Sequence, residues 1–180
     1  MLVGEGVCLR ALERTDIPRL VKWLNDPEVK RFLRSYRPIS QAEEEIWFER
    51  QIGNPNFLIF AVENEDGTHI GIISLDEIDW KNRKATMGVI IGEKGYWDRG
   101  YGTDAVKTLL RFAFDELNLN RVEVSVYDFN LRAIRCYEKC GFVIEGRLRQ
   151  SIFRNGRYHD ELKMAILKEE WRRQHGRDGR

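Results

Sequence analysis

Cysteine and histidine are scarce in this chain of 180 residues, which has three of each. An odd and sparse set of cysteines excludes the disulfide framework of a small secreted domain. Cys136 and Cys140 have the spacing of a metal pair, but none of the three histidines is placed to join them. We therefore expect no metal site and interpret these cysteines as small buried residues. The histidines are His69, His159 and His175.

Long apolar runs and an excess of charge of one sign are also absent. No run approaches the roughly 20 residues of a membrane-spanning helix, and the first sixteen residues lack the apolar stretch of a secretory signal. Lys and Arg number 30 against 29 Asp and Glu, a net charge of +1, without the basic excess of a nucleic-acid-binding protein. We expect a protein of the reducing cytoplasm that binds neither membranes nor nucleic acid.

Apolar periodicity predicts a single α+β domain around a mixed sheet. Strands are predicted over residues 7–12, 57–62, 69–75, 85–91, 121–126, 142–153 and 158–167. Helices are predicted over residues 16–24, near residue 28, from residue 40, over 101–117 and over 130–140. The strands between residues 57 and 91 should form an antiparallel meander. Residues 171–180 are polar and contain glycine, so we expect a frayed tail there.

The third predicted helix begins with a capping signal. Ser40 and Glu43 have the spacing of a capping box, in which each side chain bonds the other residue's backbone N–H. Within this helix we expect Ile46 and Trp47 to contact the core.

The segment between the strand at 85–91 and the helix at 101–117 contains the sequence YWDRGYGTDA. Gly100 and Gly102 leave room where the chain turns and where a ligand can approach the backbone. Free N–H groups and the positive end of the helix dipole then favour an anion such as a pyrophosphate. Taken alone, a plain strand-to-helix turn explains these glycines equally well. A dinucleotide-binding fingerprint is disfavoured, because Ala105 replaces its third glycine and the loop follows a meander.

A second motif, NLRAIRCYEKCGF, spans residues 130–142. In this order and at this separation the two motifs resemble those of the GNAT acetyltransferases. Within that superfamily they are most similar to the branch of spermidine acetyltransferases and ribosomal-protein N-terminal acetyltransferases. The segments LRALERTD and RNGRYHDELKMAILKEEW fit the same branch. The resemblance implies a single N-acetyltransferase domain over residues 1–170, with a splayed strand pair in a mixed central sheet flanked by helices.

The resemblance also implies acetyl-CoA as the co-substrate. Its pantetheine arm would enter between strand residues 87–92 and 122–126 and pair with the backbone of Ile90 and Ile91. Asn130 matches an asparagine that contacts this arm. The pyrophosphate would lie on the loop of Arg99, Gly100, Tyr101, Gly102 and Thr103. The loop departs from the common pattern at Trp97, where many members have Gln or Arg, and Asp98 must point away from the anion.

Acetyl transfer in this family is a direct attack of a neutral amine on the thioester, without a covalent enzyme intermediate. Tyr137 matches the tyrosine near the sulfur, and an ordinary pKa of about 10 suits protonation of the departing thiolate. Its helix face also carries Ala133, Ile134 and Cys140, so a core role is the alternative. A backbone N–H near Ile90 or Ile91 would polarise the carbonyl.

The group that deprotonates the amine is not specified by the motifs. Glu77 and Asp79 follow a predicted strand on the expected substrate side, and Ser125 on a later strand could orient the amine or relay a proton. Each is equally well explained as an ordinary strand-end or surface group. A chain of water molecules without a dedicated base is a further alternative.

The expected acceptor region is basic, with Lys30, Arg31, Arg34 and Arg37. Since like charges repel a polyamine, we expect as acceptor a small-molecule amine or a protein N-terminus that is not a polycation. A polyamine-specific enzyme would need these cations to face solvent and acids to line the pocket, among them Glu43, Glu44, Asp76, Glu77 and Asp79. A non-catalytic acyl-CoA-binding or sensing module, a nucleotide-binding structural domain and a homodimer stay open.

Overall fold

The structure, a computed structural model, describes residues 1–176 and contains one eight-stranded mixed sheet. Across the sheet the order is β1-β2-β3-β4-β5-β6-β8-β7. Only β5 and β6 pair in parallel among the described strands; all other neighbours are antiparallel. The strands are β1 (Leu2–Val3), β2 (Val7–Ala11), β3 (Leu58–Asn64), β4 (His69–Asp79), β5 (Lys84–Ile91), β6 (Arg121–Tyr127), β7 (Val143–Arg154) and β8 (Arg157–Leu167).

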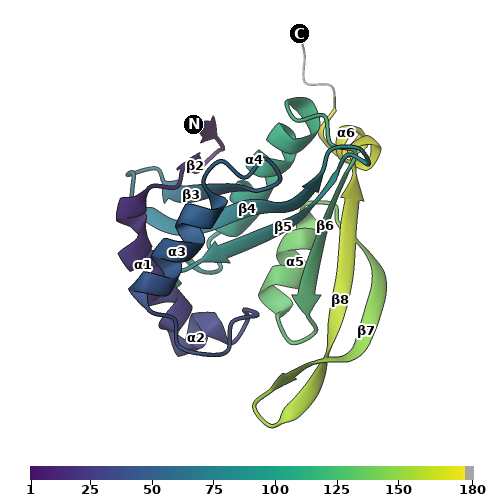
Figure 1. The fold of residues 1–180 in the computed structure, drawn as a ribbon. Helices are drawn as coiled ribbons and strands as arrows, with labels where there is room; N and C mark the ends of the chain where they lie inside the picture. Colours follow the sequence, from purple (N-terminus) through teal and green to yellow (C-terminus); the bar gives the residue numbers. More distant parts are fainter. Residues whose placement is uncertain (177–180) are drawn as a thin grey trace.

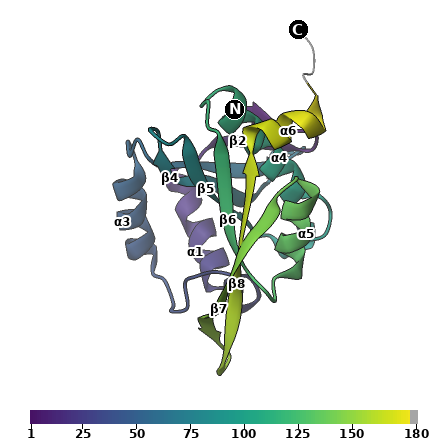
Figure 2. The same ribbon diagram turned by 90° about the vertical axis from the view of Figure 1, so that its right-hand side faces the viewer.

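Helices cover both faces of this sheet. They are α1 (Ile17–Asn25), α2 (Pro27–Lys30), α3 (Gln41–Gln51), α4 (Tyr101–Asp115), α5 (Leu131–Lys139) and α6 (Lys168–His175). Helices α1 and α3 lie on one face and α4 and α5 on the other, while the β7–β8 hairpin extends past the rest of the fold (Figures 1 and 2). None of the helices within residues 1–176 combines the length and hydropathy that a membrane span requires.

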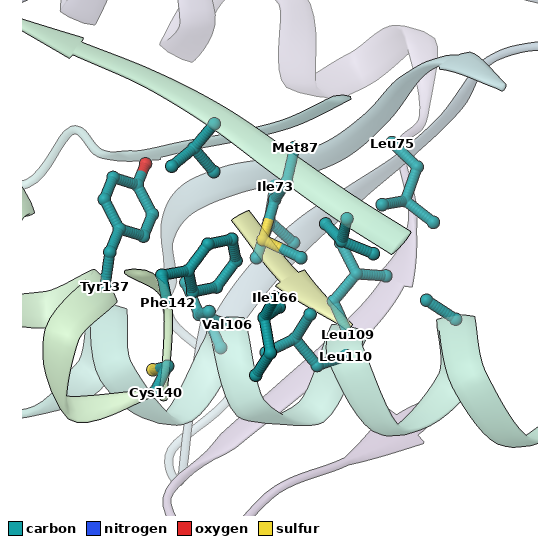
Figure 3. Close-up of a cluster of buried hydrophobic side chains, with 14 of the residues drawn as sticks. Ile73, Leu75, Met87, Val106, Leu109, Leu110, Tyr137, Cys140, Phe142 and Ile166 are labelled. Carbon is teal, nitrogen blue, oxygen red and sulfur yellow. The ribbon is translucent and has the colours of Figure 1, made fainter. Parts of the chain in front are cut away.

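Two apolar clusters arise from the alternation of side chains along the strands. On one face, Ile73 and Met87 pack with residues of α4 such as Leu109 (Figure 3). On the other face, Ile72 and Ile90 pack against the cluster formed by α1, α2 and α3. The sheet therefore separates an α4–α5 side from an α1–α3 side.

Helix α3 begins as predicted but packs differently. The Ser40–Glu43 capping box is present. Ile46, however, is 53% exposed, whereas Phe48 and the carboxyl-bearing Glu44 are buried. The expectation for Ile46 was wrong, because the helix turns the face of residues 44 and 48 toward α1 and the sheet.

The expected polar tail is helical as far as His175. Helix α6 is capped by the Glu170 carboxylate, which accepts a 2.9 Å hydrogen bond from the Leu167 N–H. Trp171 is buried, with its ring 6.2 Å from that of Phe114, and the His175 ring stacks on it at 3.7 Å. Trp171 thus packs the otherwise polar helix α6 against the core. The packed part of the chain therefore continues past residue 170. Residues 177–180 lie outside the described part.

Candidate active site

The parallel strands β5 and β6 separate after three residue pairs. Lys84, Ala85 and Thr86 face Arg121, Val122 and Glu123, and the pairing ends there. Farther along, β5 continues to pair with β4, and β6 with β8. A cleft of about 1010 Å³ runs along this opening, which is the predicted splay. The edges of β5 and β6 that face it can hydrogen-bond an extended ligand as an added strand would.

One end of the cleft is closed by the glycine-containing loop and the start of α4. Gly100 is the N-cap of α4 with φ of +88°, and within the described residues no side chain caps this helix. The N–H groups of the first turn therefore remain available to an anion. A Cβ added at Gly102 would lie 3.7 Å from Ile91 Cγ1 and 3.9 Å from Cys136 Sγ, which is ordinary contact. The fold itself accepts a Cβ there, so the glycine matters for the space in front of the backbone.

Arg99 directly precedes Gly100 in this loop, and its side chain is exposed. Its guanidinium lies 5.3 Å from the ring centroid of Tyr96 and 5.7 Å from that of Tyr101. The Tyr101 hydroxyl donates a 3.0 Å hydrogen bond to Glu65. Two aromatic rings thus orient a guanidinium beside the first turn of α4, where it could pair with an anion.

The two departures from the family pattern are accounted for by their contacts. The Asp98 carboxylate pairs with Arg132 at 3.1 Å, and the same guanidinium lies 4.1 Å from the Trp97 ring centroid. The charge of Asp98 is therefore compensated beside the glycine-containing loop. The Trp97 indole donates a 2.6 Å hydrogen bond to the Ile91 carbonyl. One backbone group that we expected pantetheine to use is thus already bonded.

Helix α5 brings Tyr137 to the α4–α5 side of the cleft. The Asn130 side chain starts this helix by accepting a 3.3 Å hydrogen bond from the Ala133 N–H. The Tyr137 ring packs 5.3 Å from that of Phe142, with its hydroxyl directed away from the apolar cluster (Figure 3). Burial, together with the Cys136 and Cys140 thiols, raises the pKa of Tyr137. The phenol is therefore protonated at neutral pH, as a proton donor must be.

All three cysteines are free. The Thr103 hydroxyl lies 3.6 Å from Cys136 Sγ, and Cys140 Sγ lies 3.6 Å from the Thr103 carbonyl, so these thiols join α5 to α4. Within residues 1–176 no group of three or more His, Cys, Asp or Glu side chains is arranged to hold a metal ion.

Strand register gives the cleft a second, polar half on the α1–α3 side. Ser74 faces Gly88 and Asp76 faces Thr86 across β4 and β5, and Thr86 in turn faces Glu123 on β6. These residues alternate with the buried core positions, so they share the opposite face. The loop between α2 and α3 covers them with Phe32, Leu33 and Arg34. An acceptor can thus approach from the side of the sheet opposite Tyr137.

Different contacts surround the three residues that were predicted to act on the amine, which are Glu77, Asp79 and Ser125. Glu77 is exposed with φ of +50°, at a register shift between Asp76 and Asp79. Asp79 bonds the Asn82 backbone and amide at 2.9 and 2.7 Å and so stabilises the turn after β4. Ser125 accepts a hydrogen bond from the Lys163 ammonium group.

Asp76 is the residue that sequence reasoning did not single out as a base. It is partly buried, and its Oδ1 has no hydrogen-bond partner within residues 1–176. The signal was present in the alternation of β4: since Ile73 and Leu75 are apolar, Ser74 and Asp76 belong to the opposite face. The sequence-based prediction considered the acids that follow the strand and therefore selected Glu77.

The four basic residues of the expected acceptor region do not act as one cluster. Arg37 pairs with Glu43 at 2.6 Å, and Arg31 lies 4.9 Å from the Phe32 ring centroid. Arg34 alone among the four lines the cleft. The Arg154 guanidinium, from the β7–β8 hairpin, donates hydrogen bonds to the carbonyls of Leu33 and Arg34 and holds this part of the loop in place.

Residues 7–143 match the acetyltransferase (GNAT) domain family. The chain is a GNAT acetyltransferase. It is 34% identical over 171 residues to the spermidine N(1)-acetyltransferase of Vibrio cholerae, with 94% of this chain and 97% of that protein covered. It is 33% identical over 180 residues to the putative ribosomal N-acetyltransferase YdaF of Bacillus subtilis, with 94% and 95% covered.

The fold of this GNAT acetyltransferase is similar to that of solved enzymes. The crystal structure of spermidine N-acetyltransferase from Vibrio cholerae in complex with CoA and spermine superposes with a TM-score of 0.87 at 31% identity, covering 92% of this chain and 98% of that one. The family and the branch predicted from the two motifs are confirmed, and so is an enzyme that acetylates an amine.

Proposed function

We propose that this enzyme acts in the cytoplasm and transfers the acetyl group of acetyl-CoA to the primary amine of a small molecule or to a protein N-terminus. The observation that carries the proposal is the cleft itself, which passes between β5 and β6 from the phosphate loop and Tyr137 to the polar face of β4. A similar solved enzyme binds CoA. The three free cysteines fit a reducing compartment.

In this proposal the donor binds by the groups expected from the motifs. The loop from Arg99 to Thr103 holds the pyrophosphate, and Asn130 contacts the arm. The β5 backbone at Ile90 and Ile91 pairs with pantetheine, apart from the Ile91 carbonyl, which Trp97 already bonds. The remaining backbone N–H groups polarise the thioester carbonyl, and Tyr137 protonates the leaving thiolate. Alignment of the two substrates supplies much of the rest of the rate.

The charges along the acceptor side support an amine with a negative group farther along the molecule. Asp76 and Glu77 line the cleft on β4, where they would attract an ammonium group. Toward the hairpin, Arg34 and Lys163 lie 3.6 and 3.7 Å from the single carboxylate of Glu161. Two cations that share one carboxylate leave a net positive charge, which attracts an anion and repels the second amine of a polyamine.

The test compares kcat/KM for spermidine with that for a short peptide whose free N-terminus is followed by acidic residues. A broader panel of small amines accompanies them, and each is monitored through the thiol released from acetyl-CoA. We expect the acidic acceptor to react faster and its rate to fall as salt screens Arg34 and Lys163. A large preference for spermidine would contradict the acceptor class. Binding of acetyl-CoA without turnover of any amine would favour a sensing module instead.

A further inference from the structure

Two cysteines at the end of α5 lie beside the loop that is proposed to hold the pyrophosphate. Cys136 lines the cleft and is partly exposed, whereas Cys140 is fully buried. The Cys136 sulfur lies 3.6 Å from the Thr103 hydroxyl, and the Cys140 sulfur lies 3.6 Å from the Thr103 carbonyl. A Cβ at Gly102 would lie 3.9 Å from the Cys136 sulfur. Both thiols therefore contact the first turn of α4.

The spacing of the two cysteines permits a bond between them. The Cys140 N–H donates a 3.2 Å hydrogen bond to the Cys136 carbonyl, so the helical spacing continues through the last turn of α5. Residues four apart in a helix share a face and lie about 6 Å apart, and the Cα atoms of a disulfide span roughly 4.4–6.8 Å. Since Cys140 is the C-cap rather than an interior residue, its side chain can turn toward Cys136 without breaking the helix.

Their surroundings make the two thiols chemically different. Hydrogen bonding with Cys140 lowers the pKa of Cys136 against the opposing effect of burial, and the Thr103 hydroxyl and the charge of Lys139 lower it further. The same hydrogen bond and burial raise the pKa of Cys140. Because the thiolate is the nucleophile, Cys136 is the thiol that reacts first with an oxidant in the cleft, while Cys140 stays protonated beside it.

We propose that hydrogen peroxide converts Cys136 and Cys140 to a reversible disulfide that weakens the binding of acetyl-CoA. The Cys136 thiolate attacks a peroxide oxygen and the O–O bond breaks, which leaves a sulfenic acid and a hydroxide ion. The Cys140 thiol then attacks the Cys136 sulfur, so the S–S bond forms, the S–O bond breaks and the thiol proton leaves with the hydroxide as water. The two thiols lose two electrons, and one peroxide molecule becomes two water molecules once the first hydroxide takes up the proton that Cys136 had released. Thiol exchange reverses the reaction.

The effect on acetyl-CoA passes through Thr103, and this part of the proposal rests on the proposed function. A disulfide brings the two sulfurs to about 2 Å and removes the thiol hydrogen that Cys140 donates to the Thr103 carbonyl. Thr103 and Gly102 belong to the turn proposed to bind the pyrophosphate, so oxidation changes the packing behind that turn. By linkage, bound acetyl-CoA must disfavour the disulfide by the same factor.

The first measurement locates the disulfide in the full chain. Trypsin cleaves after Arg135 and after Lys139, so the two cysteines fall in different peptides. Hydrogen peroxide should link these two peptides, and dithiothreitol should separate them again. Cys140→Ser should instead leave a sulfenic acid on Cys136 that dimedone traps. Peroxide treatment that never yields the linked pair would overturn the proposal.

The second measurement is the melting shift with acetyl-CoA. We expect the oxidised wild type to bind acetyl-CoA about 5–150-fold more weakly than the reduced protein, the usual range of coupling between two sites, and dithiothreitol to restore the shift. Excess acetyl-CoA should slow the formation of the linked pair. After peroxide, Cys136→Ser should keep its shift. Cys8→Ser is the matched control and should lose the shift as the wild type does, since Cys8 lies apart on β2.

Two outcomes separate this proposal from the proposed function. A linked pair with an unchanged melting shift would overturn the coupling between Cys136 and acetyl-CoA. Reduced wild type that shows no melting shift with acetyl-CoA would overturn the proposed function instead.

Discussion

Tyr137 shows how one side chain can satisfy packing and chemistry together. Its ring belongs to the same apolar cluster as Phe142 and Val106 (Figure 3), so the core role and the catalytic role are compatible. The packing uses the ring, whereas the proposed chemistry uses the hydroxyl. Removal of the hydroxyl alone therefore separates the two.

Tyr137→Phe should lower kcat by about 10²–10⁴-fold, the usual contribution of a general acid, with little change in acetyl-CoA affinity. Steady-state kinetics and the melting shift with acetyl-CoA measure the two quantities. Tyr158→Phe is the matched control, since this tyrosine is 62% exposed on the hairpin. Turnover that stays at the wild-type level, with chemistry shown to limit the rate, would remove Tyr137 from the mechanism.

At the scale of elements, the start of α4 combines an uncapped helix with glycine in its first turn. Gly102→Val would fill the space in front of the first-turn N–H groups while its Cβ makes only ordinary contacts with the fold. Valine is also a better helix former than glycine. A ligand at 100 times its Kd adds about 2.7 kcal/mol to stability, and we expect the variant to lose most of the corresponding melting shift.

The melting temperature of Gly102→Val without ligand is its own control and should stay near that of wild type. Calorimetry or dye-based melting with increasing acetyl-CoA measures both values. If the variant keeps the full shift, the pyrophosphate does not lie on this turn.

At the scale of the whole molecule, Trp23 joins the helices of the α1–α3 side to the edge of the cleft. Its indole donates a 2.9 Å hydrogen bond to Glu93, and its ring meets that of His69 edge-on at 5.0 Å. Position 92 must be glycine for this packing, because a Cβ there would lie 2.0 Å from the Trp23 ring. The contact between Trp23 and Gly92 therefore fixes helix α1 against the loop that follows β5.

Gly92→Ala should destabilise the protein by about 1–3 kcal/mol, the usual effect of overpacking, as measured by urea unfolding. Gly95→Ala is the control, since within residues 1–176 no atom beyond its two chain neighbours lies within 4 Å of a Cβ at that position. Equal stability of the two variants would mean that Trp23 moves aside without cost.

The sequence by itself determined the family, the order of elements from β2 to β8 and the glycine-containing loop before α4. These depend on spacing along the chain: Gly100 and Gly102 stand directly before a helix, and Tyr137 follows Asn130 within one helix. Capping of α3 by Ser40 and Glu43 was predictable for the same reason, because both partners lie within one turn.

Only the tertiary structure decided which charged groups meet. Arg34 differs from Arg37 because Arg154, more than a hundred residues away, holds the loop carbonyls beside it, whereas Arg37 finds Glu43. Trp171 docks α6 because Phe114 lies beneath it. Asp76 is partly buried beside the opening because the loop between α2 and α3 covers its face of β4, whereas Glu77 lies exposed at the register shift. Burial and pairing depend on residues far apart in sequence, and spacing along the chain does not encode them.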